Sequence, residues 1–142
     1  MSKTYIPVNL RGLVYERAKA TCEYCLTPEM ISFSSHQIDH IIAEKHAGAT
    51  NLDNLALACM LCNKYKGSDI ASIDPKTGKI VGLYHPRLDI WEKHFKLEKT
   101  GKIKPLTDIG RATSQLLRFN AIERISERKM LYELLNSGIK LN

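Results

Sequence analysis

The amino-acid sequence predicts an α+β fold that combines short strands with helices at both ends of the chain. Three observations support this prediction: helical periodicity near each terminus, short apolar runs bounded by turn residues between them, and four cysteines in two Cys-x-x-Cys pairs. The length of 142 residues suits one domain with its own hydrophobic core. We therefore expect residues 1–142 to form a single domain, with a core at about 8–68 and an extension at about 69–142.

Local signals divide the first half of the chain into a helix, a hairpin and a second, shorter helix. Residues 8–20 repeat apolar side chains with the period of a helix. Residues 31–42 alternate apolar and polar side chains and are predicted to form a strand, and the apolar run at 55–58 is its expected partner. Residues 60–66 are expected to form a short helix that ends at Gly67.

Two turn signals in the middle of the chain predict small β-hairpins. The segment Asp-Pro-Lys-Thr-Gly at residues 74–78 is rich in turn formers and separates two isoleucines. Thr100-Gly101 is the expected turn between strands at 94–98 and 102–106. These segments make the small β-hairpin insert of the predicted fold. The aromatic residues around them are interpreted as core rather than as base-stacking residues: Tyr84, Trp91 and Phe95.

Two helices are expected at the end of the chain. Thr107 is a suitable N-cap for a helix that runs to about Phe119. Asn120 and Glu123 have the spacing of a capping box, which predicts a second helix over about 121–137. We interpret the apolar stripe of this second helix as core, with a dimer seam as the alternative: Ile122, Ile125, Leu131, Leu134 and Leu135. The chain is accordingly expected to be a monomer or a homodimer.

The charge is positive and unevenly distributed along the chain. The formal net charge is +6, and residues 86–142 hold +5 of it, from twelve Lys and Arg against seven Asp and Glu. Such a balance favours a polyanionic partner. The densest cluster lies on the second predicted hairpin, where contact with DNA phosphates is the hypothesis and a solvated surface the alternative: Lys93, Lys96, Lys99, Lys102 and Lys104.

The sequence predicts neither a membrane-spanning segment nor a signal peptide. No apolar run approaches the roughly 20 residues that span a bilayer. Residues 1–10 lack the apolar stretch of a signal peptide. We therefore expect a cytoplasmic protein without a membrane partner.

The four cysteines form the pairs Cys22/Cys25 and Cys59/Cys62, and none is left over. A two-residue spacer lets two thiolates reach one tetrahedral zinc ion at about 2.3 Å, so two pairs complete a closed structural site. The alternatives are two disulfides or a redox dithiol. A cytosolic location disfavours disulfides, and a redox motif needs only one pair. Zn²⁺ is the expected structural cofactor.

A further group of polar residues lies between and after the cysteine pairs. Together with the cysteines they make one ordered pattern: Asp39-His40-Ile41, Gly48, Asn51-Leu52-x-Asn54-Leu55, Asn63 directly after Cys62, and Lys66. Over residues 22–67 this pattern resembles the HNH endonuclease family, also called His-Me finger or ββα-metal nucleases. It is most similar to the zinc-containing branch among restriction-type HNH proteins.

The resemblance implies a ββα-metal core clipped by the four-cysteine zinc site, and a role for each residue. His40 is implied to be the general base that activates a water molecule, while Asp39 and Asn63 hold one metal ion. For both to reach one site, the chain is implied to bend at Asp39. Asn54 is implied to brace the loop that orients His40. The expected products carry a 3′-hydroxyl and a 5′-phosphate.

The residue types themselves suit phosphodiester hydrolysis. Histidine offers a neutral imidazole that works as a base near neutral pH. The carboxylate of Asp39 and the amide oxygen of Asn63 are hard donors that favour Mg²⁺ or Mn²⁺. The name-giving pattern of the family ends in histidine, and Asn63 in its place favours Mg²⁺ over a transition metal.

The sequence therefore predicts a metal-dependent DNA endonuclease, with duplex DNA as the expected partner. Six lysines are expected to contact DNA, three beside the site and three on the second hairpin: Lys45, Lys64, Lys66, Lys96, Lys99 and Lys102. The alternative is a catalytically inactive, zinc-stabilised DNA-binding module on the same fold. A redox-active thiol protein is disfavoured because it leaves the second cysteine pair unexplained.

Overall fold

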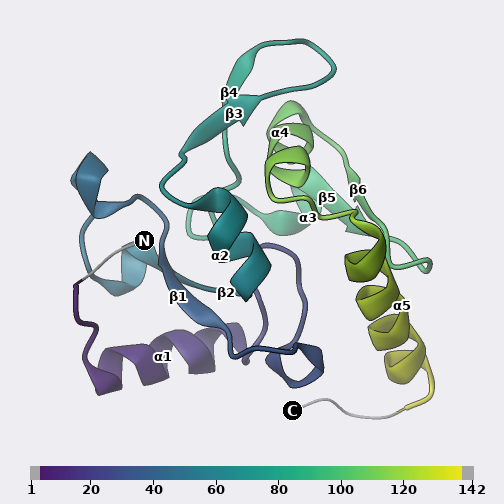
Figure 1. The fold of residues 1–142 in the computed structure, drawn as a ribbon, viewed down its shortest axis with the longest axis horizontal. Coiled ribbons are helices and arrows are strands. Elements are labelled where there is room, and N and C mark those ends of the chain that lie inside the picture. The colour runs from purple at the N-terminus through teal and green to yellow at the C-terminus, as the bar shows by residue number, and fades with distance from the viewer. Residues whose placement is uncertain (1–3, 139–142) are drawn as a thin grey trace.

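A computed structural model of the chain describes residues 4–138 and is centred on an antiparallel hairpin followed by a helix (Figure 1). Strand β1 (Gln37–His40) pairs with β2 (Leu55–Ala58), and α2 (Met60–Lys66) packs on both strands. The short helix ends at Gly67, whose positive φ of 52° suits glycine. The predicted β2 and α2 are confirmed to the residue.

Strand β2 lies between two apolar clusters, and its alternating side chains serve both. All four of its residues are buried. Leu55 and Leu57 pack with Val14 of helix α1 (Val8–Ala18), which lies against β2. Ala56 and Ala58 belong to a second cluster that includes the four cysteines. The period of two residues thus places the N-terminal helix and the cysteines on opposite faces of one strand.

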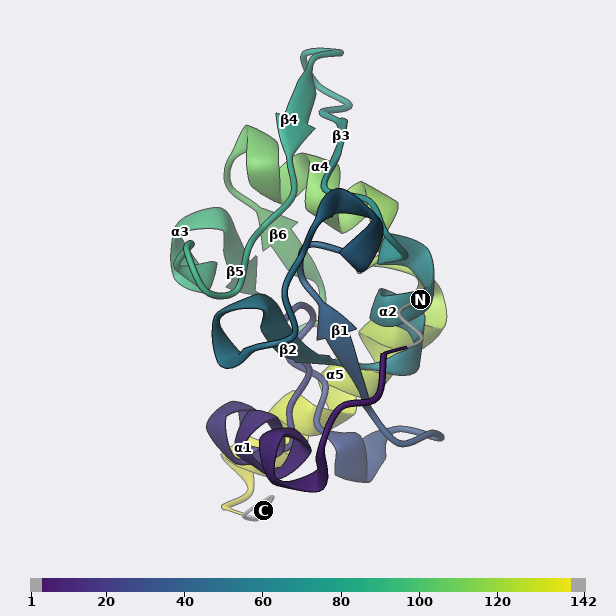
Figure 2. The ribbon, with the colours of Figure 1, turned by 90° about the vertical axis from the view of Figure 1, so that its left-hand side faces the viewer.

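The chain after α2 builds an extension from two hairpins and three helices. Its elements follow in this order: β3 (Ala71–Ile73), β4 (Ile80–Gly82), α3 (Trp91–His94), β5 (Phe95–Leu97), β6 (Ile103–Pro105), α4 (Asp108–Leu116) and α5 (Ile122–Asn136). Figure 2 shows the β3–β4 hairpin projecting from the body of the molecule. Helix α4 packs on both hairpins, and Arg111 ties it to the first through a bidentate pair with the buried Asp74. The predicted α+β fold, with its two hairpins and terminal helices, is confirmed.

The extension is fastened to the ββα unit by an aromatic group. Tyr84, Trp91 and Phe95 are all buried, as predicted, and Tyr84 and Trp91 each meet Phe95 at a centroid distance of 5.5 and 5.1 Å. The indole Nε1 of Trp91 donates a 2.9 Å hydrogen bond to the carbonyl oxygen of Tyr24. The turn that carries the first cysteine pair is therefore held by a residue of the extension.

The long strand predicted at residues 31–42 is wrong over its first half. Residues 29–31 form a 3₁₀ turn, Phe33 is fully exposed, and pairing begins only at Gln37, opposite Ala58. The cause lies in the partner strand: after Ala58 the chain turns into Cys59 and α2, so residues before Gln37 have no backbone to pair with. Alternation alone could not reveal how long the partner is.

The predicted capping box before the last helix is also wrong. Asn120 does not cap α5, whose N-cap is Ala121 without a side-chain hydrogen bond. Instead, Asn120 bridges to β6: its Oδ1 accepts from the Ile103 N–H and its Nδ2 donates to the Ile103 carbonyl, each at 2.8 Å. By contrast, the predicted cap Thr107 does accept a hydrogen bond from the Gly110 N–H at 3.0 Å.

The face that α5 turns inward differs from the predicted apolar stripe. Its buried residues are Arg124, Arg128 and Leu131, whereas Ile122 is 82% exposed. The two arginines are buried because sulfur atoms and backbone carbonyls from other elements surround them. Within the described part of the chain, no helix is long and apolar enough to cross a membrane.

Candidate active site and cysteine cluster

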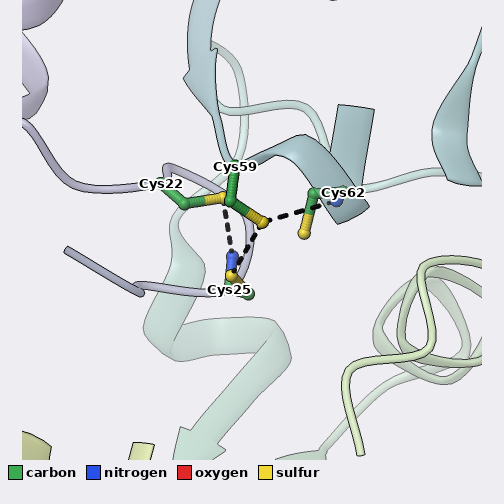
Figure 3. A group of neighbouring side chains, drawn as sticks. All are labelled: Cys22, Cys25, Cys59 and Cys62. Atoms are coloured by element: carbon green, nitrogen blue, oxygen red, sulfur yellow. Dashed lines mark hydrogen bonds between the residues drawn. The ribbon is translucent and has the colours of Figure 1, made fainter. Parts of the chain in front are cut away.

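The four cysteines meet at one point, with their sulfur atoms turned toward one another (Figure 3). All four Sγ atoms lie within 4.8 Å of each other, and Cys25 Sγ is 3.6 Å from Cys59 Sγ. Zinc–sulfur bonds of about 2.3 Å in a tetrahedron place the sulfurs roughly 3.8 Å apart. All four thiols are free and buried. The cluster is consistent with a closed structural zinc site, and the disulfide alternative does not hold.

Each Cys-x-x-Cys pair is held by the turn that contains it. The backbone N–H of Cys25 donates to Cys22 Sγ, and the N–H of Cys62 donates to Cys59 Sγ, both at 3.4 Å. The second pair stands at the start of α2, so the cluster links this helix to the chain after α1. Such donors stabilise thiolates over thiols, as a zinc site requires.

The charge state of the cluster depends on its burial and on one arginine. Burial raises the pKa of Cys22 and Cys62, whereas hydrogen bonds from the other cysteines lower the pKa of Cys25. Burial by itself would lower the pKa of Arg124, but the nearby thiolates outweigh it and raise that pKa. The cluster therefore has a permanent positive charge beside it.

A separate, open cleft of about 980 Å³ is lined by all four residues of β1. Asp39, His40 and Asn63 all line this cleft, as does Lys45. Three of the residues assigned to catalysis are therefore brought to one cavity, from the end of β1 and from α2. His36 and Gln37 line it as well.

Asp39 is 4% exposed, and two neighbouring side chains contact its carboxylate. Tyr24 donates its hydroxyl to Asp39 Oδ2 at 2.7 Å, and Lys66 Nζ lies 3.1 Å from the same oxygen. Burial raises the pKa of Asp39, while the positive charge of Lys66 and the hydrogen bond from Tyr24 oppose this rise. A carboxylate in this position is desolvated but charge-compensated.

His40 closes β1 and keeps regular pairing with β2. Its partner is Leu55, while that of Asp39 is Ala56, so the two side chains leave opposite faces of the strand. The expected bend at Asp39 is absent; the chain bends after His40, at residues 41–42. Both side chains still reach the cleft because β1 is an edge strand.

One ring nitrogen of His40 is hydrogen-bonded, and the other is buried without a hydrogen bond within residues 4–138. His40 Nε2 lies 2.8 Å from Thr50 Oγ1. Among the described residues, none hydrogen-bonds to His40 Nδ1. If Nε2 carries the proton toward Thr50, Nδ1 presents a lone pair, which is the form a general base needs.

Asn54 makes the contacts that a loop brace would make. Its Oδ1 accepts from the Ile42 N–H at 2.9 Å, and its Nδ2 donates to the carbonyls of Ile42 and Ala49 at 2.9 and 2.8 Å. The loop closes tightly on this side chain: a Cβ on Gly48 would meet the Ile42 oxygen at 1.7 Å. Only glycine fits there.

Asn63 is oriented by a neighbour on β1. Its side chain is largely buried, and its Nδ2 donates to Gln37 Oε1. A hydrogen bond from the amide nitrogen fixes the direction of the amide oxygen, the donor that a hard cation would use. Asp39 and Asn63 thus offer oxygen ligands in one cleft, which fits a Mg²⁺-type ion.

The six lysines expected to contact DNA fall into three environments. Lys45 lines the cleft and Lys64 is exposed on α2. Lys66 is not on the surface, where contact with DNA would require it: it is 2% exposed. Its Nζ pairs with Asp39 and donates a hydrogen bond to the His40 carbonyl. The remaining three are exposed on the β5–β6 hairpin: Lys96, Lys99 and Lys102.

Three contacts of these sites were not predicted from the sequence: Tyr24 with Asp39, Thr50 with His40, and Arg124 with the cysteines. Tyr24 had a signal, since an aromatic residue inside a Cys-x-x-Cys pair must lie near the metal centre. Thr50 sits in a turn-rich loop, and Arg124 is separated from the nearest cysteine by more than sixty residues. Nothing local marks either one.

The chain is similar to known proteins over most of its own length, but it spans only a small part of the relative that it matches. Residues 22–69 match the family described as HNH endonuclease. The chain is also similar to the CRISPR-associated endonuclease Cas9 of Corynebacterium diphtheriae (strain ATCC 700971 / NCTC 13129 / Biotype gravis), with 36% identity over 122 residues. This match spans 84% of the chain but only 10% of the relative. No solved structure matches the chain.

Proposed function

We propose that this chain, whose residues 22–69 match the HNH endonuclease family, is a metal-dependent nuclease that hydrolyses phosphodiester bonds in DNA. One observation carries the proposal: Asp39, His40 and Asn63, from two different elements, line the same open cleft. The similarity to a Cas9 endonuclease supports it. A nuclease function follows from the family, whereas the substrate and the mechanism rest on the geometry of this site.

His40 is the general base in this proposal. Its Nδ1 takes a proton from a water molecule, whose oxygen attacks the phosphorus atom. The bond from phosphorus to the 3′ oxygen breaks, and that oxygen takes a proton from solvent, which leaves a 3′-hydroxyl and a 5′-phosphate. Thr50 holds His40 by its Nε2, which leaves Nδ1, a buried atom without a hydrogen bond among the described residues, as the basic nitrogen.

Asp39 and Asn63 would hold a Mg²⁺ or Mn²⁺ ion. When bound, such an ion supplies charge stabilisation for the phosphate oxygens. Tyr24 and Lys66 orient the Asp39 carboxylate and oppose the rise in its pKa that burial causes. Gln37 orients the Asn63 amide, and Asn54 holds the loop behind His40.

The cysteine cluster would hold a structural Zn²⁺ ion. Four thiolate ligands would complete the coordination of that ion and leave no place for a substrate, so its contribution would be to fasten α2 to the first cysteine turn. Asn63 and Lys66 both lie on α2, and Tyr24 lies in that turn. Zinc thereby positions residues around Asp39 without taking part in the reaction.

DNA would be held at two surfaces. Lys45 at the cleft and Lys64 on α2 are placed for phosphates near the reaction. The second surface is the lysine hairpin, defined by exposed residues of α3 and of the β5–β6 hairpin: Lys93, Lys96, Lys99, Lys102 and Lys104. Lys96 stands directly opposite Lys104, an unfavourable like-charge pair that an anionic partner would relieve.

The β5–β6 hairpin lies apart from β1 (Figure 1), so the lysine hairpin would hold a part of the nucleic acid remote from the cut. Contacts of this kind add affinity that is independent of base sequence. The single-domain organisation, the cytoplasmic location and the monomer or homodimer state remain predictions.

The alternative function is a catalytically inactive, zinc-stabilised DNA-binding module. The lysine hairpin suits both functions, but the cleft lined by Asp39, His40 and Asn63 favours the nuclease.

A plasmid-cleavage assay separates the two. Purified protein is incubated with supercoiled DNA and Mg²⁺ or Mn²⁺, and nicked and linear products are followed with and without EDTA. Wild type is expected to cut, and His40→Ala to lose at least 100-fold in rate, in the range typical of a lost general base. The matched control is His46→Ala, which removes an exposed histidine from the loop that follows.

The outcomes of this assay distinguish the nuclease from the binding module. Cutting by wild type and by His46→Ala, with loss in His40→Ala and in EDTA, supports the nuclease. Binding of DNA without cutting in either metal, across methylated and unmethylated plasmids, would favour the binding module. Equal cutting by His40→Ala and wild type would remove His40 from the mechanism.

A further inference from the structure

Helix α5 buries two arginines where an amphipathic helix normally buries apolar side chains. Arg124 is 3% exposed and Arg128 is fully buried. Burying a guanidinium is costly unless its charge and its hydrogen-bond donors are met by partners. The partners of the two arginines differ in kind, and this difference indicates what Arg124 does.

Arg124 points into the cysteine cluster. Its Nη2 lies 3.0 Å from Cys62 Sγ and 3.5 Å from Cys59 Sγ. Its Nη1 donates to the backbone carbonyls of Leu117 at 2.5 Å and Arg118 at 3.2 Å, which fixes the plane of the guanidinium. The carbonyls that follow α4 thus hold the guanidinium in place, and its charge faces the two sulfurs of the second cysteine pair.

Arg128, one turn later, has only oxygen partners. Its Nε donates to the Gly101 carbonyl at 2.7 Å, and its Nη2 donates to the Phe119 carbonyl and approaches Asn120 Oδ1. These contacts fasten α5 to the β5–β6 turn. A buried arginine on this helix therefore does not by itself imply a contact with sulfur, and the placement of Arg124 is specific.

A zinc ion held by four thiolates carries a double negative charge, and the cysteines here are buried. Such a charge in a desolvated position needs compensation. We propose that Arg124 is the counter-charge of the zinc–thiolate cluster, and that it makes metal binding and the docking of α5 depend on each other. This inference rests on the zinc occupancy proposed above.

The coupling crosses the limits of the family match. All four cysteines lie within residues 22–69, whereas Arg124 comes from a helix outside that range. Zinc stabilises the helix by holding the sulfurs that Arg124 needs, and the helix stabilises zinc by supplying positive charge. Because the two effects share one coupling free energy, each must appear when the other is measured.

The first test measures zinc affinity directly, by competition with a chromophoric chelator, for wild type and three variants. Arg124→Met keeps the length of the side chain without its charge, and Arg124→Lys keeps a charge without the planar fork. The matched control is Lys129→Met, which removes an exposed charge from the same helix. We expect Arg124→Met to bind zinc about 10- to 100-fold more weakly, Arg124→Lys to lose less, and the control to match wild type.

The second test uses unaltered protein and does not depend on any variant folding. Amide hydrogen exchange is followed before and after zinc is removed with a chelator. We expect amides 124–131 of α5 to lose protection at a lower chelator concentration than those of α4, which is held by contacts with both hairpins. Re-addition of zinc should restore α5.

The results separate this inference from the zinc proposal itself. Absence of zinc in purified wild type, by elemental analysis and after zinc addition, would overturn the metal site. Two results would overturn the role of Arg124 alone. One is that wild type binds zinc and Arg124→Met binds it with equal affinity. The other is that the amides of α5 stay as protected after zinc is removed as they were before. None of these readouts requires nuclease activity.

Discussion

The hydroxyl of Tyr24 donates a 2.7 Å hydrogen bond to Oδ2 of Asp39. Tyr24 stands between Cys22 and Cys25, so one hydrogen bond joins the cysteine cluster to the carboxylate that lines the cleft. The phenol is 1% exposed, and burial together with the charge of Asp39 raises its pKa well above the usual range. Tyr24 is therefore a lasting donor, and the metal centre can influence the cleft through it.

Tyr24→Phe tests this connection. The ring packs edge-on against Tyr84, so the phenylalanine should fold and keep zinc, while Asp39 loses one hydrogen bond. We expect the cleavage rate to fall about 10-fold and the Mg²⁺ concentration for half-maximal rate to rise, as for a lost outer contact of a metal ligand. Rates measured across a Mg²⁺ titration check this. Tyr132→Phe on α5 is the control, and equal losses in both variants would speak against the link.

Thr50 is expected to act through His40. Thr50→Val keeps the shape but removes the hydroxyl at 2.8 Å from Nε2, so the imidazole loses the group that sets its orientation. We predict a fall of roughly 10-fold in kcat with little change in KM, because substrate binding does not need this hydroxyl. Thr50→Ser should recover the rate. A serine variant as slow as valine would show that packing, not hydrogen bonding, matters there.

Asn54 should contribute mainly to stability. Asn54→Ala leaves the N–H and carbonyl of Ile42 and the carbonyl of Ala49 without this partner in a tightly closed loop. The free energy of unfolding is predicted to fall by about 2–3 kcal/mol, the cost of unsatisfied buried polar groups. Denaturant unfolding measures it. Asn51→Ala, an exposed asparagine three residues earlier, should stay within about 0.5 kcal/mol of wild type.

Zinc removal should loosen the core and silence the cleft together. Cys62→Ser takes one sulfur from the cluster and weakens the hold on α2, which carries Asn63. We expect the midpoint of thermal unfolding to fall on the order of 10 °C and cleavage to be lost even in excess Mg²⁺. Calorimetry and elemental analysis check this. In wild type stripped of metal, zinc but not Mg²⁺ should restore the midpoint.

The lysine hairpin should contribute affinity for DNA rather than catalysis. Lys96, Lys99 and Lys102 changed together to glutamate are expected to weaken DNA binding and to flatten its salt dependence by about 2–3 in log–log slope. Fluorescence anisotropy across a salt series measures both. The control changes three exposed lysines elsewhere, Lys76, Lys79 and Lys129. Equal effects of both sets would mean that net charge alone is responsible.

Much of the local structure could be predicted from the sequence, because the signals act over a few residues. The apolar run of β2, the Thr107 cap and the 74–78 turn each depend on neighbours along the chain. The strand predicted from residue 31 failed because its length depends on Ala58, the last residue of its partner. Asn120 failed as a cap because the edge of β6 offered it two better-placed backbone groups.

The sequence by itself determined the α+β arrangement, the gathering of four cysteines and the family pattern, since periodicity, turn chemistry and ligand spacing are written in consecutive residues. Only the tertiary structure decided where the charges go. Lys66 is paired with Asp39 rather than open to DNA, and Arg124 faces sulfur atoms from a helix that looked apolar. A charged side chain becomes buried only where distant segments bring it an opposite charge or a set of acceptors, and no local pattern contains that information.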